Sequence, residues 1–218
     1  MFSIYATIFL VAYSSSVIEH ALGNNIEHVI VLMLENRAFD HMLGFMKAQN
    51  ADIEGCLTGM DGCDNPIDPL DMTSEKVSVT NTAVYQQTSP GHSISSTTSQ
   101  IYGSSNTSAD MNGFIASYTS KTDGENEKGS AIMKCFSEEH IPAITSLAKE
   151  FAMFDGWFAS VPGPTEVNRA YAASATSNGM GTNDAEKMVK GFPQKTMFKQ
   201  IEEMGLDSGC ISSWCPLC

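Results

Sequence analysis

The stretch VIVLMLENRAFDHMLG, residues 29–44, sets the local fold. It opens with six apolar residues, three of them β-branched, a pattern typical of a strand buried on both faces, as in a parallel sheet. The apolar run ends abruptly at Glu35 and Asn36. Apolar residues then recur at helical spacing. We therefore predict a buried strand over residues 28–34, a tight junction, and a helix over residues 38–48.

Further along the chain, strand and helix patterns alternate. Apolar spacing predicts helices over residues 93–102, 141–151 and 195–204, and a strand over residues 154–160 that leads through a Pro/Gly turn into a helix of small residues. Residues 50–90 are rich in Asp, Asn, Pro, Ser and Thr, which predicts a long surface excursion. Alternating strands and helices indicate an α/β fold.

Glu35 and Asn36 follow the first predicted strand directly. In α/β sheets, ligands bind at the carboxyl ends of strands. A carboxylate beside a carboxamide offers two oxygen ligands for a divalent cation. These two residues are therefore candidate metal ligands. The alternative is that Asn36 or Asp40 only caps the following helix.

A second candidate site is VPGPTEVNR, residues 161–169, where an apolar segment again enters a Pro/Gly turn and a helix. Thr165 lies near the predicted helix start, where unpaired N–H groups favour a phosphate. A Thr hydroxyl is a poor nucleophile unless it is activated, and metal coordination is one way to activate it. The alternative is that Thr165 is a plain helix N-cap.

A third candidate is His92 in SPGHS, residues 89–93, which follows a turn and precedes a predicted helix. The imidazole of His92 has the chemistry to donate a hydrogen bond to an anion or to act as a general acid. Spacing alone does not separate this role from that of a solvated loop histidine.

The termini and the net charge bear on location and partners. The net charge of −13 over 218 residues argues against a nucleic-acid binder. Residues 4–13 form an apolar run, and a small-residue site follows at residues 21–23, which together predict a secretory signal over residues 1–23 and a secreted protein. The alternative is a buried N-terminal element.

The six cysteines fit a secreted protein in part. Cys56 and Cys63 bracket a Gly-rich turn, and we predict a disulfide between them, since a zinc site needs closer pairs and more ligands. Residues 106–108 form a candidate glycosylation sequon. Cysteine is concentrated in the last residues of the chain, at Cys210, Cys215 and Cys218.

Five motifs of the chain resemble those of one family, in the same order. They are ENRAFDHMLG, SPGHS, MNGF, the segment IPAITSLAKEFAMFDGWFASVPGPTEVNRAYAASATSNG, and GFPQKTMF, and they span roughly residues 26–206. The sequence resembles the phosphoesterase family, which includes plant-type non-specific phospholipases C, bacterial phospholipases C and related acid phosphatases.

The resemblance implies a fold like that of the alkaline phosphatase superfamily, with a mainly parallel sheet between helices. It also implies metal-dependent cleavage of phosphate esters. Glu35 and Asn36 match the family's metal ligands, and Thr165 matches the nucleophile, which also touches the metal. The expected cofactor is a divalent metal ion, whose identity the oxygen ligands leave open.

The resemblance also implies residues near the substrate. His92 matches a histidine near the substrate phosphate and is expected to take a catalytic part. Asn168 and Arg169 match the block after the nucleophile and are expected to bind substrate. The expected partner is a phospholipid or a small phosphate ester, with peripheral membrane contact and without nucleic acid. The oligomeric state stays open.

The chain also departs from the family. Members are longer, and their second half carries an Asp pair and several His residues, whereas this chain has no His after His140. We therefore expect residues 24–206 to be the N-terminal part of a phosphoesterase domain and residues 207–218 an aberrant Cys-rich tail that arises from a frameshift, a read intron or a truncated gene model. The alternative is a short protein whose tail makes disulfides. The alternative function is a catalytically inactive homologue that binds phospholipid head groups or a partner.

Overall fold

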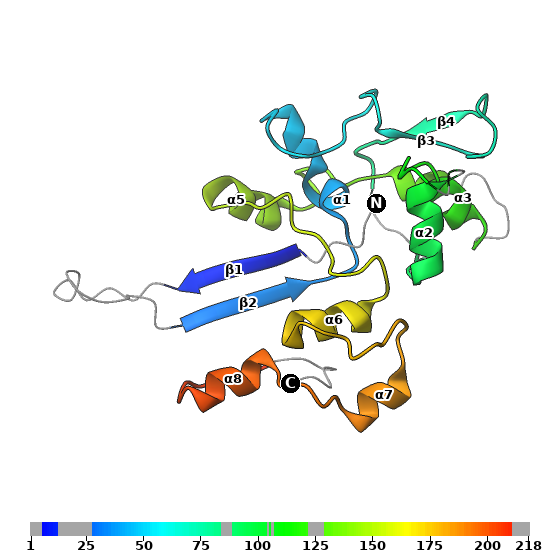
Figure 1. Ribbon diagram of the computed structural model, residues 1–218. Helices are drawn as coiled ribbons and strands as arrows, with labels where there is room; N and C mark the ends of the chain where they lie inside the picture. Colours follow the sequence, from blue (N-terminus) through cyan, green and yellow to red (C-terminus); the bar gives the residue numbers. More distant parts are fainter. Residues whose placement is uncertain are drawn as a thin grey trace.

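A computed structural model of the chain, shown in Figure 1, describes residues 6–12, 28–83, 89–103, 105, 107–121 and 129–210. The chain has a mixed α/β structure, with two-stranded sheets and several short helices. The strands and helices are β1 (Ala6–Ala12), β2 (His28–Leu34), α1 (Phe39–Leu43), η1 (Gly44–Ala48), β3 (Asp64–Pro66), β4 (Lys76–Ser78), α2 (Ile94–Tyr102), α3 (Phe114–Thr119), η2 (Ala131–Met133), α5 (Pro142–Glu150), α6 (Thr165–Ser174), α7 (Ala185–Lys190) and α8 (Met197–Glu203).

Strand β2 forms where the apolar run predicts it, but the prediction of a buried strand in a mainly parallel sheet is not met by the described residues. β2 pairs antiparallel with β1, from His28 opposite Ala12 to Leu34 opposite Ala6. All seven residues of β2 are exposed, with Val29 at 64% and Leu34 at 40%. Apolar side chains on both faces need a cover on both sides, and the described part of the chain supplies none.

The helix predictions are largely confirmed. α1 follows β2 and ends in the 3₁₀ helix η1, and both pack against α5 through a core of Leu43, Phe45, Met46 and Ile53. α2, α5 and α8 lie within their predicted ranges. α6 (Thr165–Ser174) begins and ends earlier than the small-residue helix that the sequence predicts over residues 170–179, and α3 and α7 were not predicted. The predicted strand at residues 154–160 is wrong, because this segment is irregular and exposes the aromatic side chains of Phe154 and Phe158.

A disulfide and one buried side-chain amide hold the long segment that follows η1. Cys56 and Cys63 form the predicted disulfide, with 5.4 Å between their Cα atoms. The amide of Asn65, on β3, accepts from the N–H groups of Phe114 and Ile115 and donates to the carbonyl of Met111 at 2.7 Å. Asn65 therefore satisfies N-terminal N–H groups of α3 that have no partner within the helix.

Helix α6 is held by its own core. Val167 and Ala170 are buried together with Met180 and with Met188 of α7. Thr165, Glu166 and Arg169 lie on another face of the same helix, because 3.6 residues complete a turn. The core thus fixes the helix whose first turn carries the candidate nucleophile.

The pKa of His41, on α1, predicts a pH-dependent stability. Burial, and then the nearby charge of Arg37, lowers the pKa of His41 from 6.5 to about 4. The folded state therefore keeps the ring neutral, stacked on Phe136 with 5.0 Å between ring centroids. Since the unfolded chain binds the proton more tightly, stability is full above pH 6.5 and falls toward pH 4, by roughly 3 kcal/mol for this group.

The measurement is thermal unfolding between pH 8 and pH 4. Burial raises the pKa of the neighbouring Asp40 carboxyl, which works in the opposite direction at the acidic end. His41→Phe keeps the stacking ring and is expected to flatten the profile between pH 6.5 and pH 5. An unchanged profile in His41→Phe would contradict this assignment.

Several sequence predictions fall outside the described residues. They are the signal cleavage site at residues 21–23, Asn106 of the sequon, and the last two cysteines, Cys215 and Cys218. In the part of the chain that is described, no helix combines the length and apolar character needed to cross a membrane.

Candidate functional site

Glu35 and Asn36 lie at the carboxyl end of β2, at the tight junction before α1 (Figure 1). Asn36 has a φ of 67°, in the left-handed region that Asn tolerates better than most residues. The N-cap of α1 is Ala38, without a side-chain cap, so neither Asn36 nor Asp40 plays the capping role of the alternative reading. The left-handed backbone conformation at this position therefore favours Asn, independently of any role of Asn36 as a metal ligand.

Arg169 of α6 joins Glu35 to this helix. Its Nε donates to Oε1 of Glu35 and its Nη2 donates to Oε2, both at 2.6 Å. On the other side, Nη1 donates to Oε1 of Glu166 at 3.2 Å. The side chains of Glu35, Arg169 and Glu166 are 14%, 28% and 13% exposed, so the three charges are largely shielded from water. We call these three residues the carboxylate–arginine cluster.

Thr165 is the first residue of α6, one turn before Arg169. Residues four apart are neighbours on a helix surface, so Thr165 lies beside the carboxylate–arginine cluster. The N-cap position belongs to Pro164, and α6 has no side-chain cap. The alternative reading of Thr165 as a plain N-cap is therefore wrong. The structure joins the candidate ligand Glu35 to α6 at Arg169, one turn after the candidate nucleophile.

Asn168 shapes the turn that presents Thr165. Its side chain is buried, and its Oδ1 accepts from the N–H of Val161 at 3.1 Å. Its Nδ2 lies within 3.1–3.3 Å of the carbonyls of Val161, Gly163 and Pro164. These contacts stabilise residues 161–164 in the one conformation that leads into α6. They give Asn168 a structural role, while its predicted substrate contact stays a prediction.

His92 lies just before α2, and α2 reaches the same turn. A Cβ atom on Gly163 would lie 3.1 Å from Cγ1 of Ile94, so the start of α2 packs directly on the turn before Thr165. The His92 side chain is exposed, and its Nδ1 is 3.2 Å from the carbonyl of Pro90. The fold thus brings the start of α2 near the turn before α6 from a distant part of the sequence, while the predicted role of His92 stays a prediction.

The donors gathered here suit a hard divalent cation. Glu35, Asn36 and Thr165 all offer oxygen atoms, which such cations prefer. Oε2 of Glu166 is a further oxygen, buried and without a hydrogen-bond partner in the described part of the chain. The described residues contain no group of three or more His, Cys, Asp or Glu side chains arranged for a metal. A cation bound here would complete its coordination with other oxygen ligands such as water.

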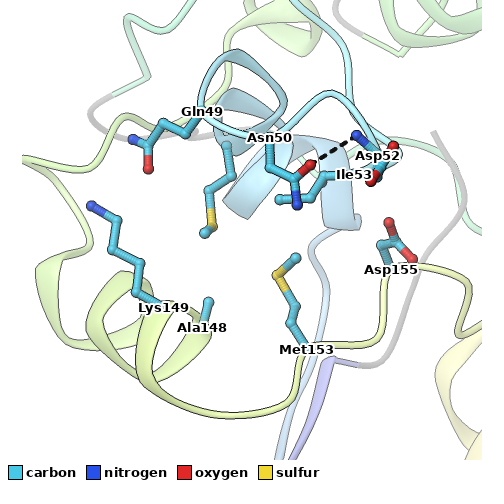
Figure 2. A pocket seen from close by; sticks show the side chains of 9 residues that line it. Gln49, Asn50, Asp52, Ile53, Ala148, Lys149, Met153 and Asp155 are labelled. Atoms are coloured by element: carbon cyan, nitrogen blue, oxygen red, sulfur yellow. Dashed lines mark hydrogen bonds between the residues drawn. The ribbon is translucent and has the colours of Figure 1, made fainter.

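A separate hollow lies away from these residues. Figure 2 shows it between the loop after η1 and helix α5, with a volume of about 450 Å³ and with Lys149, Asp52 and Asp155 on its walls. Asp155 is held in place by accepting the N–H of Glu54 at 2.8 Å. The hollow shares no lining residue with the carboxylate–arginine cluster. The candidate site residues Glu35, Asn36 and Thr165 therefore lie outside this hollow.

Two residues of the site were missed by sequence reasoning. Glu166 was not singled out, although its spacing of three residues from Arg169 on a helix is a signal for an ion pair. Asn183 accepts the N–H of Glu166 at 2.9 Å and so satisfies a free donor at the start of α6. Asn183 is 17 residues further along the chain, and no local pattern marks it.

The sequence of the chain is similar to those of known proteins. The sequence profile described as the phosphoesterase family matches residues 26–211. Non-specific phospholipase C1 of Arabidopsis thaliana is 41% identical over 91% of this chain and 37% of its own length. Non-specific phospholipase C3 of the same plant is 36% identical over 88% of the chain and 38% of its own. Phospholipase C A of Mycobacterium tuberculosis is 26% identical over 92% of the chain and 42% of its own length.

Proposed function

This chain belongs to the phosphoesterase family, and from that premise we propose that it hydrolyses phosphate ester bonds in the manner of a phospholipase C. The observation that carries the proposal is the bidentate pair between Glu35 and Arg169, which joins the end of β2 to α6 one turn after Thr165. A carboxylate and a hydroxyl that are distant in sequence thus lie at one site.

Thr165 acts as the nucleophile in this proposal. Its Oγ1 forms a bond to phosphorus as the bond from phosphorus to the alcohol oxygen breaks, and the hydroxyl proton leaves Thr165 to balance the proton gained by the alcohol. Water then hydrolyses the phosphothreonine. His92 assists a proton transfer or donates a hydrogen bond to a phosphate oxygen. The N–H groups at the start of α6 favour the phosphate charge.

Glu35, Asn36 and Thr165 are the residues that would hold the divalent metal ion. Such an ion lowers the pKa of a coordinated hydroxyl and offsets the negative charge of the phosphate. The oxygen-only donor set supports this assignment, and so does the buried Oε2 of Glu166 beside it. Neither the oxygen donors nor the Glu166 carboxylate identifies the metal ion.

Several finer parts of the proposal rest on the family resemblance. We propose that residues 24–206 are a phosphoesterase segment of the alkaline phosphatase type. We propose a secretory signal at residues 1–23 and a secreted protein. A phospholipid or small phosphate ester is the proposed substrate, with peripheral membrane contact. Arg169 and Asn168 are proposed to lie near that substrate.

A second candidate function is binding without turnover. The chain spans 37% of the length of the plant phospholipase C1 that it matches. In addition, both oxygens of Glu35 are engaged by Arg169. This engagement of Glu35 favours a protein that binds phospholipid head groups, or a partner, without completing the reaction.

The test is hydrolysis of p-nitrophenyl phosphate and p-nitrophenyl phosphorylcholine by the full chain, with MnCl₂ and with a chelator. We expect turnover that requires the cation and that is lost in Glu35→Gln. Glu186→Gln, an exposed carboxylate on α7, is the matched control and should keep full turnover. A folded chain that binds these esters but releases no nitrophenol would contradict the enzyme and support the binding function.

A further inference from the structure

The two oxygens of Glu35 are taken by one guanidinium. Nε and Nη2 of Arg169 donate to them side by side at 2.6 Å, the fork geometry in which Arg binds a carboxylate most strongly. A cation that chelates Glu35 through both oxygens would need the space in which this guanidinium lies. Arg169 and a divalent cation would therefore compete for the same carboxylate.

Glu166 holds Arg169 from the other side. Its Oε1 accepts from Nη1 at 3.2 Å, while its Oε2 is buried without a hydrogen-bond partner among the described residues. The carboxylate–arginine cluster therefore has two negative charges and one positive charge. One guanidinium balances half of this negative charge, which leaves a net negative charge that attracts a divalent cation. The guanidinium of Arg169 thus lies between two carboxylates, in the position that a divalent cation would take.

We propose that Arg169 is the internal counter-ion of the cation site and is displaced from Glu35 when a divalent cation binds. This inference rests on the proposed function, in which Glu35 is a metal ligand. A guanidinium left beside a bound divalent cation repels it strongly at such a short separation. Glu166 keeps the displaced side chain at the start of α6, one turn from Thr165, where a guanidinium suits a phosphate. Cation binding thus frees Arg169 for the substrate.

The experiment is calorimetric titration of MnCl₂ into the full chain without substrate. Arg169→Gln removes the competing charge and is expected to bind Mn²⁺ at least about tenfold more tightly than the wild type. Without Mn²⁺ the same variant is expected to melt at a lower temperature, since Glu35 and Glu166 lose their counter-ion. Lys190→Gln, which removes a cation from an exposed ion pair with Glu186, is the control and should leave the affinity unchanged.

The outcomes separate this inference from the proposed function. If Glu35→Gln abolishes binding but Arg169→Gln binds Mn²⁺ no more tightly than the wild type, the counter-ion role is overturned and the cation site remains. If Glu35→Gln binds like the wild type, or no variant binds, both are overturned. Should Arg169→Gln fail to fold, Arg169→Lys takes its place. A lysine keeps the positive charge but cannot donate to both oxygens of Glu35 side by side. The Arg169→Lys protein is therefore expected to bind Mn²⁺ more tightly than the wild type, by a smaller factor than Arg169→Gln. An affinity for Mn²⁺ equal to or weaker than that of the wild type would overturn the counter-ion role of Arg169.

Discussion

Thr165→Ala is expected to lower the turnover of p-nitrophenyl phosphorylcholine by a factor of the order of 10⁴ or more, as loss of a nucleophile does in other hydrolases. The proposed reaction has no other group that can form the bond to phosphorus. The fold should be unaffected, because Thr165 is neither the N-cap of α6 nor a member of the core around Val167 and Ala170. We expect the free energy of unfolding to change by less than about 1 kcal/mol.

Thr165→Ser is the matched variant for this prediction. It keeps a hydroxyl on the first residue of α6 and is expected to retain measurable turnover, whereas the alanine variant is not. Steady-state rates and thermal unfolding of the three proteins would be measured in the same buffer with MnCl₂. If Thr165→Ala turned over like the wild type, Thr165 could not be the nucleophile, whatever the role of the cation.

Asn168→Asp is expected to have the largest effect on stability, although it replaces one side-chain atom. The amide Nδ2 donates toward the carbonyls of Val161, Gly163 and Pro164, and a carboxylate in its place has no proton to offer and repels them. Since the side chain is buried, we expect a loss of roughly 3 kcal/mol or more. Turnover should fall with it, because residues 161–164 position Thr165.

The chain offers a control of the same chemistry for this prediction. Asn183 uses its Oδ1 to accept the N–H of Glu166, and an aspartate there keeps the acceptor. A negative charge at the start of a helix is also favourable. Asn183→Asp should therefore melt within a degree or two of the wild type, by thermal unfolding followed by circular dichroism. Equal losses in the two variants would show that the donor of Asn168 is not what stabilises the turn.

Local elements of the fold could be predicted from the sequence because they leave a periodic pattern. β2 and α1 follow from the residues between 28 and 48, and the turn residues before α2 and α6 mark the helix starts. Burial could not be predicted in the same way. The apolar run of β2 indicates that both faces of the strand need to be covered, but it does not indicate which other elements cover them. In the described residues β2 is exposed.

The candidate site was predicted in its residue types and less in its contacts. Glu35 and Thr165 were identified from their positions after apolar segments and from the family motifs. The pair between Glu35 and Arg169 joins residues 134 positions apart, so no local pattern indicates it. The same holds for Asn183, whose contact with Glu166 depends on how the chain turns after α6.

The most direct test of the proposed mechanism is whether Thr165 carries the phosphoryl group during turnover. The full chain would be mixed with p-nitrophenyl phosphate and MnCl₂, quenched in acid, digested, and its peptides analysed by mass spectrometry. We expect one phosphorylated peptide, modified at Thr165 and absent from the Thr165→Ala protein. Release of nitrophenol by the same sample without any phosphothreonine at this position would contradict it.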